Sequence, residues 1–167
     1  IKRAGEALHA VIFTGGASDG VLLAREMRKA GLQLPLIGSE DLFCDEYLQG
    51  GDAVNDTLVY ATFSADNRSP AVDAFVQDFG AAKPDRFAAL AYDTFMVVAD
   101  AIKAAGSTDA SSIREAIVSR KDFEGATGKT AFSRDNAPMK HPLIYRIQKS
   151  ESGERAFVRK AGATPRP

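Results

Sequence analysis

Strand and helix patterns alternate over residues 10–63, and this alternation limits the possible folds more strongly than any other sequence feature. The apolar run at 10–13 ends in Thr-Gly-Gly, which is typical of a strand buried on both faces of a sheet. A helix is predicted over 18–30 and ends at Gly31. A second strand over 34–37, a helix over 41–49 and a third strand over 57–63 follow. This β-α-β-α-β order predicts an α/β fold built on a parallel sheet.

The second half of the chain is predicted to be mostly helical. Ser69 followed by Pro70 marks a helix start, because serine caps the first turn and proline fits its first position. Further helices are predicted over 85–105 and 109–120, and strands over 129–132, 143–148 and 156–159. The tail over 161–167 is predicted to be disordered.

The composition is that of one folded domain of ordinary size, with 167 residues, 45% apolar side chains and a formal net charge of −1. This charge balance offers no electrostatic attraction for nucleic acid or for an anionic membrane surface. The single Cys44 excludes an internal disulfide, and we expect it to be a buried free thiol. No signal peptide is recognisable, and a start at Ile1 fits either a processed protein or a fragment.

Motifs for catalysis, metal binding and cofactor binding are not recognisable in the sequence. The Gly-Lys-Thr at 128–130 imitates a phosphate-binding loop, but Phe123 stands where that loop requires glycine and no helix pattern follows. His9 and His141 lack companion ligands at metal-binding spacing. We therefore predict no catalytic residue, no metal site and no cofactor.

The loop after the first strand is a candidate binding loop, because ligands of open α/β sheets bind outside the carboxyl ends of the strands. It contains Gly16, Ala17 and Ser18. The glycine lets backbone approach a ligand, although the geometry of a tight turn explains it equally well. Ser18 or Asp19 is expected to cap the helix that follows.

The loop after the second strand brings two acidic residues to the corresponding place. Asp41 is expected to cap the next helix and to interact favourably with its dipole. Glu40 would then remain at the strand end, where a carboxylate is suited to binding an ammonium group through charge-assisted hydrogen bonds. A solvated loop acid is the alternative interpretation.

The order and spacing of several motifs resemble the type I periplasmic solute-binding proteins, particularly the branched-chain amino-acid (Leu/Ile/Val) receptors of ABC importers. The matching segments are 11–16, 35–40, 87–93, 104–109 and the glycine-containing stretch 123–132. The resemblance implies an α/β fold of two lobes with three-layer parallel sheets, which are joined by three crossover strands and close on a ligand by hinge motion. The chain resembles only the C-terminal half of such a receptor.

The resemblance also assigns parts of the chain to the two lobes. Residues 1–60 correspond to the second, C-terminal lobe, and 64–125 to the first, N-terminal lobe. Residues 126–160 correspond to crossover and closing strands, followed by the tail. Half a receptor leaves apolar faces uncovered, so we expect the chain on its own to self-associate. The residues expected on these faces are Val72, Phe75, Val76, Phe79, Phe87, Leu90, Phe95 and Val98.

Several residues match positions of the family's ligand pocket. Glu40 resembles the acid that accepts the ligand's α-ammonium group, and 16–18 resemble the pocket loop. Many relatives carry an aromatic residue after the paired glycines, so the small residues here leave room for a larger solute or remove a contact. Tyr92 and Asp93 match the family's Tyr-Asp pair, and their helix faces either the cleft or the core; a tyrosine in a helix is most often a core or boundary residue.

The resemblance implies a binding protein and not an enzyme. It would capture an amino acid of the branched-chain type, or a related small polar solute, and deliver it to an ABC permease in the membrane. The implied location is periplasmic or otherwise extracytoplasmic. A ligand-sensing regulatory domain of the same fold and a Rossmann-like enzyme fragment are the alternatives. The lack of a Gly-x-Gly-x-x-Gly motif argues against the enzyme.

Overall fold

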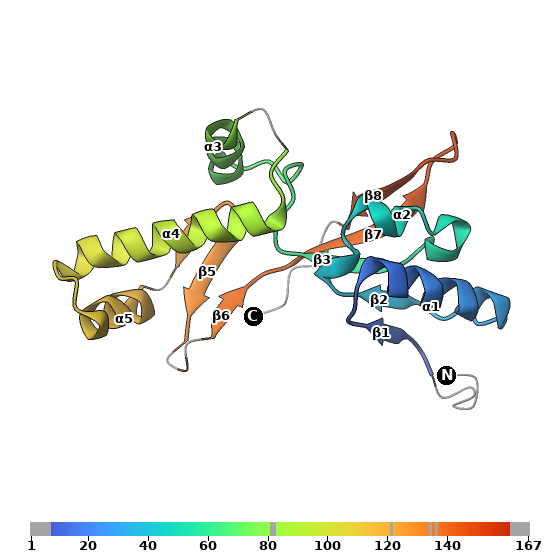
Figure 1. Ribbon diagram of the computed structural model, residues 1–167, viewed down its shortest axis with the longest axis horizontal. Coiled ribbons are helices and arrows are strands. Elements are labelled where there is room, and N and C mark those ends of the chain that lie inside the picture. Colours follow the sequence, from blue (N-terminus) through green and yellow to red (C-terminus); the bar gives the residue numbers. More distant parts are fainter. Residues whose placement is uncertain (1–7, 81–82, 121, 134, 136, 161–167) are drawn as a thin grey trace. The chain divides into compact units, whose positions relative to one another are not determined.

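The computed structural model describes residues 8–80, 83–120, 122–133, 135 and 137–160 (Figure 1). The chain divides into two compact units. Unit 1 comprises Ile1–Ala61 and Pro142–Pro167, and unit 2 comprises Thr62–His141. The segment 126–160, expected to supply crossover and closing strands, is therefore divided between the units at residue 142. The predicted tail over 161–167 lies outside the described residues.

Unit 1 contains a five-stranded sheet in the order β1-β2-β3-β7-β8. The strands are β1 (Val11–Phe13), β2 (Leu36–Gly38), β3 (Leu58–Ala61), β7 (Leu143–Lys149) and β8 (Arg155–Arg159). The first three are parallel, as predicted, whereas β3 pairs antiparallel with β7 and β7 with β8. In this register Phe13 lies opposite Gly38, and Ala61 lies opposite Leu143.

The first helix, α1 (Ala17–Lys29), ends as predicted. Gly31 has a φ of 75°, and the Leu32 amide donates to the Met27 carbonyl at 2.9 Å, which closes the last turn. The start differs from the prediction, because Gly16 is the N-cap and no side chain caps the helix. Ser18 and Asp19 lie within the first turn, so the capping role predicted for them is wrong.

The helix predicted over 41–49 is confirmed only over Asp45–Leu48. The chain forms a 3₁₀ turn, η2 (Glu40–Leu42), then the short helix α2 (Asp45–Leu48) and a second 3₁₀ turn, η3 (Gly51–Val54). The break comes at Phe43, whose ring packs against Tyr145 and Phe157 at centroid distances of 4.6 Å each. Ser39 is the N-cap of η2, so the capping role predicted for Asp41 is also wrong.

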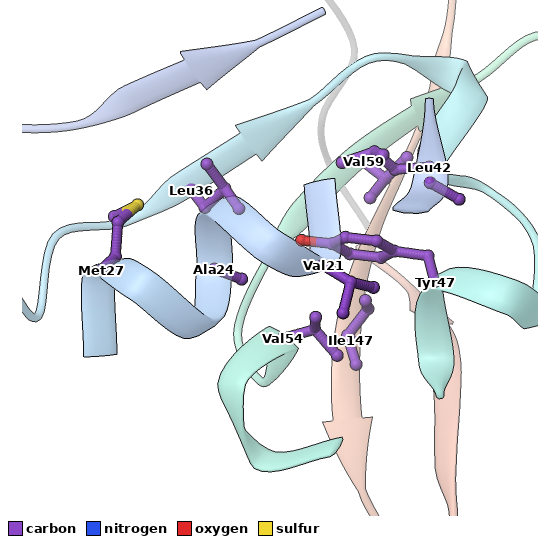
Figure 2. Packing of buried hydrophobic residues seen from close by; sticks show 10 residues of the cluster. Val21, Ala24, Met27, Leu36, Leu42, Tyr47, Val54, Val59 and Ile147 are labelled. Atoms are coloured by element: carbon purple, nitrogen blue, oxygen red, sulfur yellow. The ribbon is translucent and has the colours of Figure 1, made fainter. Parts of the chain in front are cut away.

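One face of the unit 1 sheet packs against α1, α2 and η3 to form the main core, and Figure 2 shows its side chains. Leu36 and Val59 of the sheet are almost fully buried there. Tyr47 of α2 is fully buried, and its hydroxyl lies 3.2 Å from the Thr57 hydroxyl. Burial raises the pKa of Tyr47, because the charged phenolate would lose its water. Cys44, expected to be buried, is a partly buried free thiol at the edge of this core.

The opposite face of the same sheet carries apolar side chains that remain in contact with solvent. Ile12, Tyr60 and Val158 are exposed by 75, 41 and 41%. They alternate along their strands with the buried residues of the core face, as the two-residue period of a strand requires. The sheet is therefore apolar on both sides, as expected of a sheet that is covered on both faces.

In its described residues, unit 2 contains three helices and a three-stranded antiparallel sheet. The helices are α3 (Pro70–Phe79), α4 (Arg86–Ala105) and α5 (Ala110–Ser119), and the strands are β4 (Phe123–Gly125), β5 (Gly128–Phe132) and β6 (Pro138–Lys140). The three helices and β5 were predicted, whereas β4 and β6 were not. Side chains of Ser69, Asp85 and Asp109 cap the three helices.

The apolar faces of α3 and α4 differ from the expectation in part. Val72 and Phe75 are each only 2% exposed, because Phe63 and the partly buried Tyr92 cover them, so the exposed face predicted for α3 is wrong at these positions. On α4, Phe87 and Phe95 are 64 and 71% exposed, as expected. The buried side of α4 consists of Ala89, Asp93, Val97 and Ala101.

Within the described ranges, no helix has both the length and the apolar character needed to cross a membrane.

Candidate functional site

The loop after β1 contains two glycines: Gly15 packs against a neighbouring side chain, and Gly16 has open space beside it. A Cβ at Gly15 would lie 2.6 Å from Cζ of Phe13, so a larger residue there would require the Phe13 ring to move. A Cβ at Gly16 would meet nothing within 4 Å. Ala17 is buried and Ser18 is exposed. The surface beside Gly16 and Ser18 is therefore accessible, whereas Ala17 belongs to the core of unit 1.

The loop after β2 starts at the same edge of the sheet. Phe13 and Gly38 are neighbours in the register, and the Ser39 amide donates to the Phe13 carbonyl at 3.0 Å. Ser39 is buried, with its hydroxyl 3.5 Å from a carboxylate oxygen of Asp41. Glu40 follows as the first residue of η2 and is partly buried. The carboxyl edge of β1 and β2 thus holds both loops, and the ends of the strands are joined by a backbone hydrogen bond.

Tyr92 and Asp93 belong to unit 2, whereas the other predicted site residues, 16–18 and Glu40, belong to unit 1. The Tyr92 ring is partly buried and packs against Phe75 at a centroid distance of 5.0 Å. Asp93 is 5% exposed, and its carboxylate accepts hydrogen bonds from the backbone amides of Ala126 and Thr127 at 2.8 Å each. The side chain of Asp93 therefore points to the turn between β4 and β5.

A groove of about 740 Å³ lies between α4 and α5, and it contains none of the predicted site residues. Small side chains such as Ala101 and Ala104 form much of its wall, with Glu115 nearby. Asp100 and Arg120, which also line it, form an ion pair at 2.7 Å. Open α/β sheets bind ligands at the carboxyl edge of their strands, so the edge of β1 and β2 is the better candidate despite the size of this groove.

In the described part of the chain, no three or more His, Cys, Asp or Glu side chains gather closely enough to hold a metal ion. The stretch that imitates a phosphate-binding loop forms the hairpin of β4 and β5, with Gly125 opposite Gly128. Its amides at Ala126 and Thr127 bind the carboxylate of Asp93. The hairpin thus accounts for the glycine spacing without a nucleotide.

The partners of Asp93 were missed at the sequence level, as was the link between Ser39 and Phe13. One signal for the first was present. Asp93 occurs four residues after Ala89 and four before Val97, so it lies on the buried stripe of a helix, where a carboxylate requires hydrogen-bond donors. Nothing local identifies those donors, because Thr127 is 34 positions away.

The loops after β1 and β2 lie at the carboxyl edge of a parallel sheet, which is where open α/β sheets bind ligands. The family model described as periplasmic binding protein matches residues 2–154, so the chain belongs to that family. Its fold is that of the type I members, as expected from the sequence.

Three relatives illustrate the similarity. The Leu/Ile/Val-binding protein homolog 3 of Brucella melitensis is 29% identical over 136 residues, which cover 80% of this chain and 36% of that protein. The branched-chain amino acid transporter substrate binding protein LivJ of Streptococcus pneumoniae, solved in complex with isoleucine, is 26% identical with a TM-score of 0.64 and coverages of 95 and 47%. A solute binding protein of an ABC transporter from Rhodopseudomonas palustris, solved with 3,4-dihydroxybenzoic acid, has a TM-score of 0.65 at 23% identity, with coverages of 96 and 46%, and shows the fold alone. The chain spans less than half the length of each of them.

Proposed function

We propose that this chain belongs to the solute-binding component of an ABC importer and that it helps to capture an amino acid or a related small polar solute. The observation that carries the proposal is the carboxyl edge of β1 and β2, where the accessible loop at Gly16 and the carboxylate of Glu40 occur together. Membership of the periplasmic binding protein family supports it, as does LivJ, a relative that was solved with isoleucine.

In this proposal Glu40 accepts hydrogen bonds from the α-ammonium group of the solute, since a carboxylate binds a cationic donor more strongly than a neutral one. Gly16, Ala17 and Ser18 form the adjoining wall. The small side chain of Ala17 leaves space for a bulky solute side chain. Tyr92 remains a predicted contact of the solute. Asp93 is left out of the proposed pocket, because its carboxylate already accepts hydrogen bonds from Ala126 and Thr127.

The family membership also supports an extracytoplasmic location, delivery of the solute to a membrane permease, and binding without turnover. Binding proteins of this class hold a solute between two lobes and release it on opening. We assign Ile1–Ala61 and the returning strands β7 and β8 to one lobe, and Thr62–His141 to the other.

The identity of the solute is tested by a thermal-shift screen of the full natural protein against amino acids, their amides and aromatic carboxylates. A ligand that binds only the folded state raises the unfolding midpoint in a concentration-dependent manner. We expect isoleucine or leucine to raise it. Selective stabilisation by an aromatic carboxylate that has no ammonium group would contradict the assignment of Glu40.

The assignment of Glu40 is tested by Glu40→Gln, which keeps the shape of the side chain and removes its charge. We expect the affinity for the amino acid found in the screen to fall by about 1.5–3 kcal/mol, the range for a hydrogen bond to a charged group. Isothermal titration calorimetry measures this change. Glu46→Gln, at an exposed position of α2, is the matched control and is expected to change affinity by less than about 0.5 kcal/mol. An unchanged dissociation constant for Glu40→Gln would remove Glu40 from the site.

A further inference from the structure

The buried carboxylate of Asp93 is bound by the hairpin turn between β4 and β5. One carboxylate oxygen accepts from the Ala126 amide and the other from the Thr127 amide, both at 2.8 Å. The Thr127 hydroxyl also donates to the second oxygen. Asp93, Ala126 and Thr127 are each no more than 5% exposed, so water does not replace these donors.

The turn is shaped to receive a carboxylate. A Cβ at Gly125 would lie 2.5 Å from the carboxyl carbon of Asp93, which is far inside van der Waals contact. Only glycine therefore lets the carboxylate approach the backbone at this point. The first glycine of the stretch that imitates a nucleotide-binding loop is thus required by a carboxylate from the same chain.

A positive charge lies on the other side of the same hydroxyl. The ammonium group of Lys140, at the end of β6, donates to the hydroxyls of Thr127 and Thr130. Because the Thr127 hydroxyl accepts from Lys140 and donates to Asp93, it connects the ammonium group to the carboxylate. Two backbone amides, one hydroxyl and this relayed ammonium group are a donor set that favours an anion over a neutral group.

The side chains around Asp93 on α4 determine how much its hydrogen bonds contribute to holding α4 against the β4–β5 hairpin. The other side chains on the buried stripe of α4 are Ala89, Val97 and Ala101, and two of these three are alanines. The large Phe87 and Phe95 point to solvent. Because the fully buried apolar side chains of α4 are mostly small, the hydrogen bonds of Asp93 contribute substantially to the attachment of α4 to the hairpin.

We infer that the turn at Ala126 and Thr127, together with the Thr127 hydroxyl and Lys140, is a carboxylate receptor whose natural occupant is the side chain of Asp93. The receptor joins α4 to the β4–β5 hairpin. When Asp93 is shortened, the receptor keeps its donors and becomes a binding site for a small monocarboxylate of about the size of formate.

The test is chemical rescue of Asp93→Ala in the full natural protein, with thermal unfolding as the readout. We expect the variant to unfold at a lower temperature than the unmodified protein. Sodium formate should restore part of the loss saturably, by about 2 °C at ten times its dissociation constant for a protein as long as the relatives, of which this chain spans less than half. Sodium chloride at equal ionic strength should not restore it, and formate should leave the unmodified protein unchanged.

Two further variants keep the test decisive. Asp100→Ala removes another carboxylate of α4. The partner of that carboxylate is the partly exposed Arg120, so formate should not raise the unfolding temperature of this variant. Asp93→Asn fills the receptor with an uncharged group and should be destabilised without rescue by formate. Formate shifts that are equal in Asp93→Ala and Asp100→Ala, or no shift in Asp93→Ala, would overturn the inference.

If Asp93→Ala does not fold, a double-mutant cycle between Asp93→Asn and Lys140→Met gives the answer. Since both residues act through the Thr127 hydroxyl, the double variant should lose less stability than the sum of the two single variants. Additive losses would show that the two charges act independently and would contradict the receptor.

Discussion

At the scale of single residues, Asp52 shows how an exposed side chain can connect distant parts of unit 1. Its carboxylate accepts from Lys149 at 3.1 Å, from Arg155 at 2.6 Å and from Asn55 at 3.2 Å. Lys149 and Arg155 lie on β7 and β8, so this carboxylate joins the hairpin of those strands to η3. The hydrogen bonds from Lys149 and Arg155 lower the pKa of Asp52.

This lowered pKa predicts a specific dependence of stability on pH. A carboxyl group whose pKa is lower in the folded than in the unfolded state stabilises the fold at pH values above its unfolded pKa, and loses that effect as the pH falls through the folded value. Asp52→Asn should therefore narrow the difference in the free energy of unfolding between neutral and acid pH. Urea titrations at several pH values measure it, with the exposed Glu151→Gln in the β7–β8 turn as control. Identical pH profiles for Asp52→Asn and the unmodified protein would contradict the prediction.

At the scale of secondary-structure elements, α4 depends on a cap at each end. The Asp85 carboxylate accepts from the Ala88 amide at 2.8 Å, and Gly106 ends the helix with a φ of 60°. Asp85 is exposed and lies at the end of a 20-residue helix, so replacing it removes the cap without disturbing the packing of the core. Its effect on stability can therefore be measured alone.

Asp85→Ala should reduce the free energy of unfolding by about 0.5–2 kcal/mol, because the amide of Ala88 loses its acceptor. Asp85→Ser should retain most of the stability, since serine can accept the same hydrogen bond. Chemical denaturation followed by circular dichroism compares the two variants. Equal losses for alanine and serine would show that the cap hydrogen bond contributes nothing measurable.

Helix starts with a side-chain cap were predictable from the sequence, whereas starts without such a cap and features determined by distant residues were not. The starts of α3 and α4 depend on Ser69 and Asp85, which act within one turn. The break at Phe43 depends on Tyr145 and Phe157, which no local pattern identifies. The candidate site follows the same rule.

Glu40 was placed at the strand edge by the order of strands and loops. The donors around Asp93, in contrast, required the tertiary structure, because they lie on a turn more than thirty residues further along the chain. The short strands β4 and β6 were missed for a related reason. Each has three residues, as do β1 and β2, but neither contains the continuous apolar run that identified those two strands in the sequence.

At the scale of the whole molecule, the two units each leave an apolar surface in contact with solvent. In unit 1 it includes Ile12 and Tyr60 on the sheet face opposite the core, and in unit 2 it includes Phe87 and Phe95 on α4. Side chains of this size and exposure usually mark surfaces that another element or chain covers.

The chain of 167 residues, produced alone, should therefore self-associate through these surfaces. An interface of the obligate kind, of more than about 2,000 Å², is expected. Light scattering at micromolar concentration should give a mass of at least twice 17.8 kDa. Phe95→Glu and Ile12→Glu should each weaken the association, because burying an unpaired carboxylate in the interface is unfavourable. A stable monomer of 17.8 kDa would contradict the expectation.

The pairing of Ala61 with Leu143 means that the chain leaves unit 1 and returns to it at adjacent points of one strand ladder. Viewed from unit 1, the whole of Thr62–His141 occupies the place of a hairpin loop. A two-residue turn such as Asn-Gly could connect β3 directly to β7 and keep the register. The same point could accept a foreign domain whose ends lie close together, so unit 1 is a natural scaffold for domain grafting.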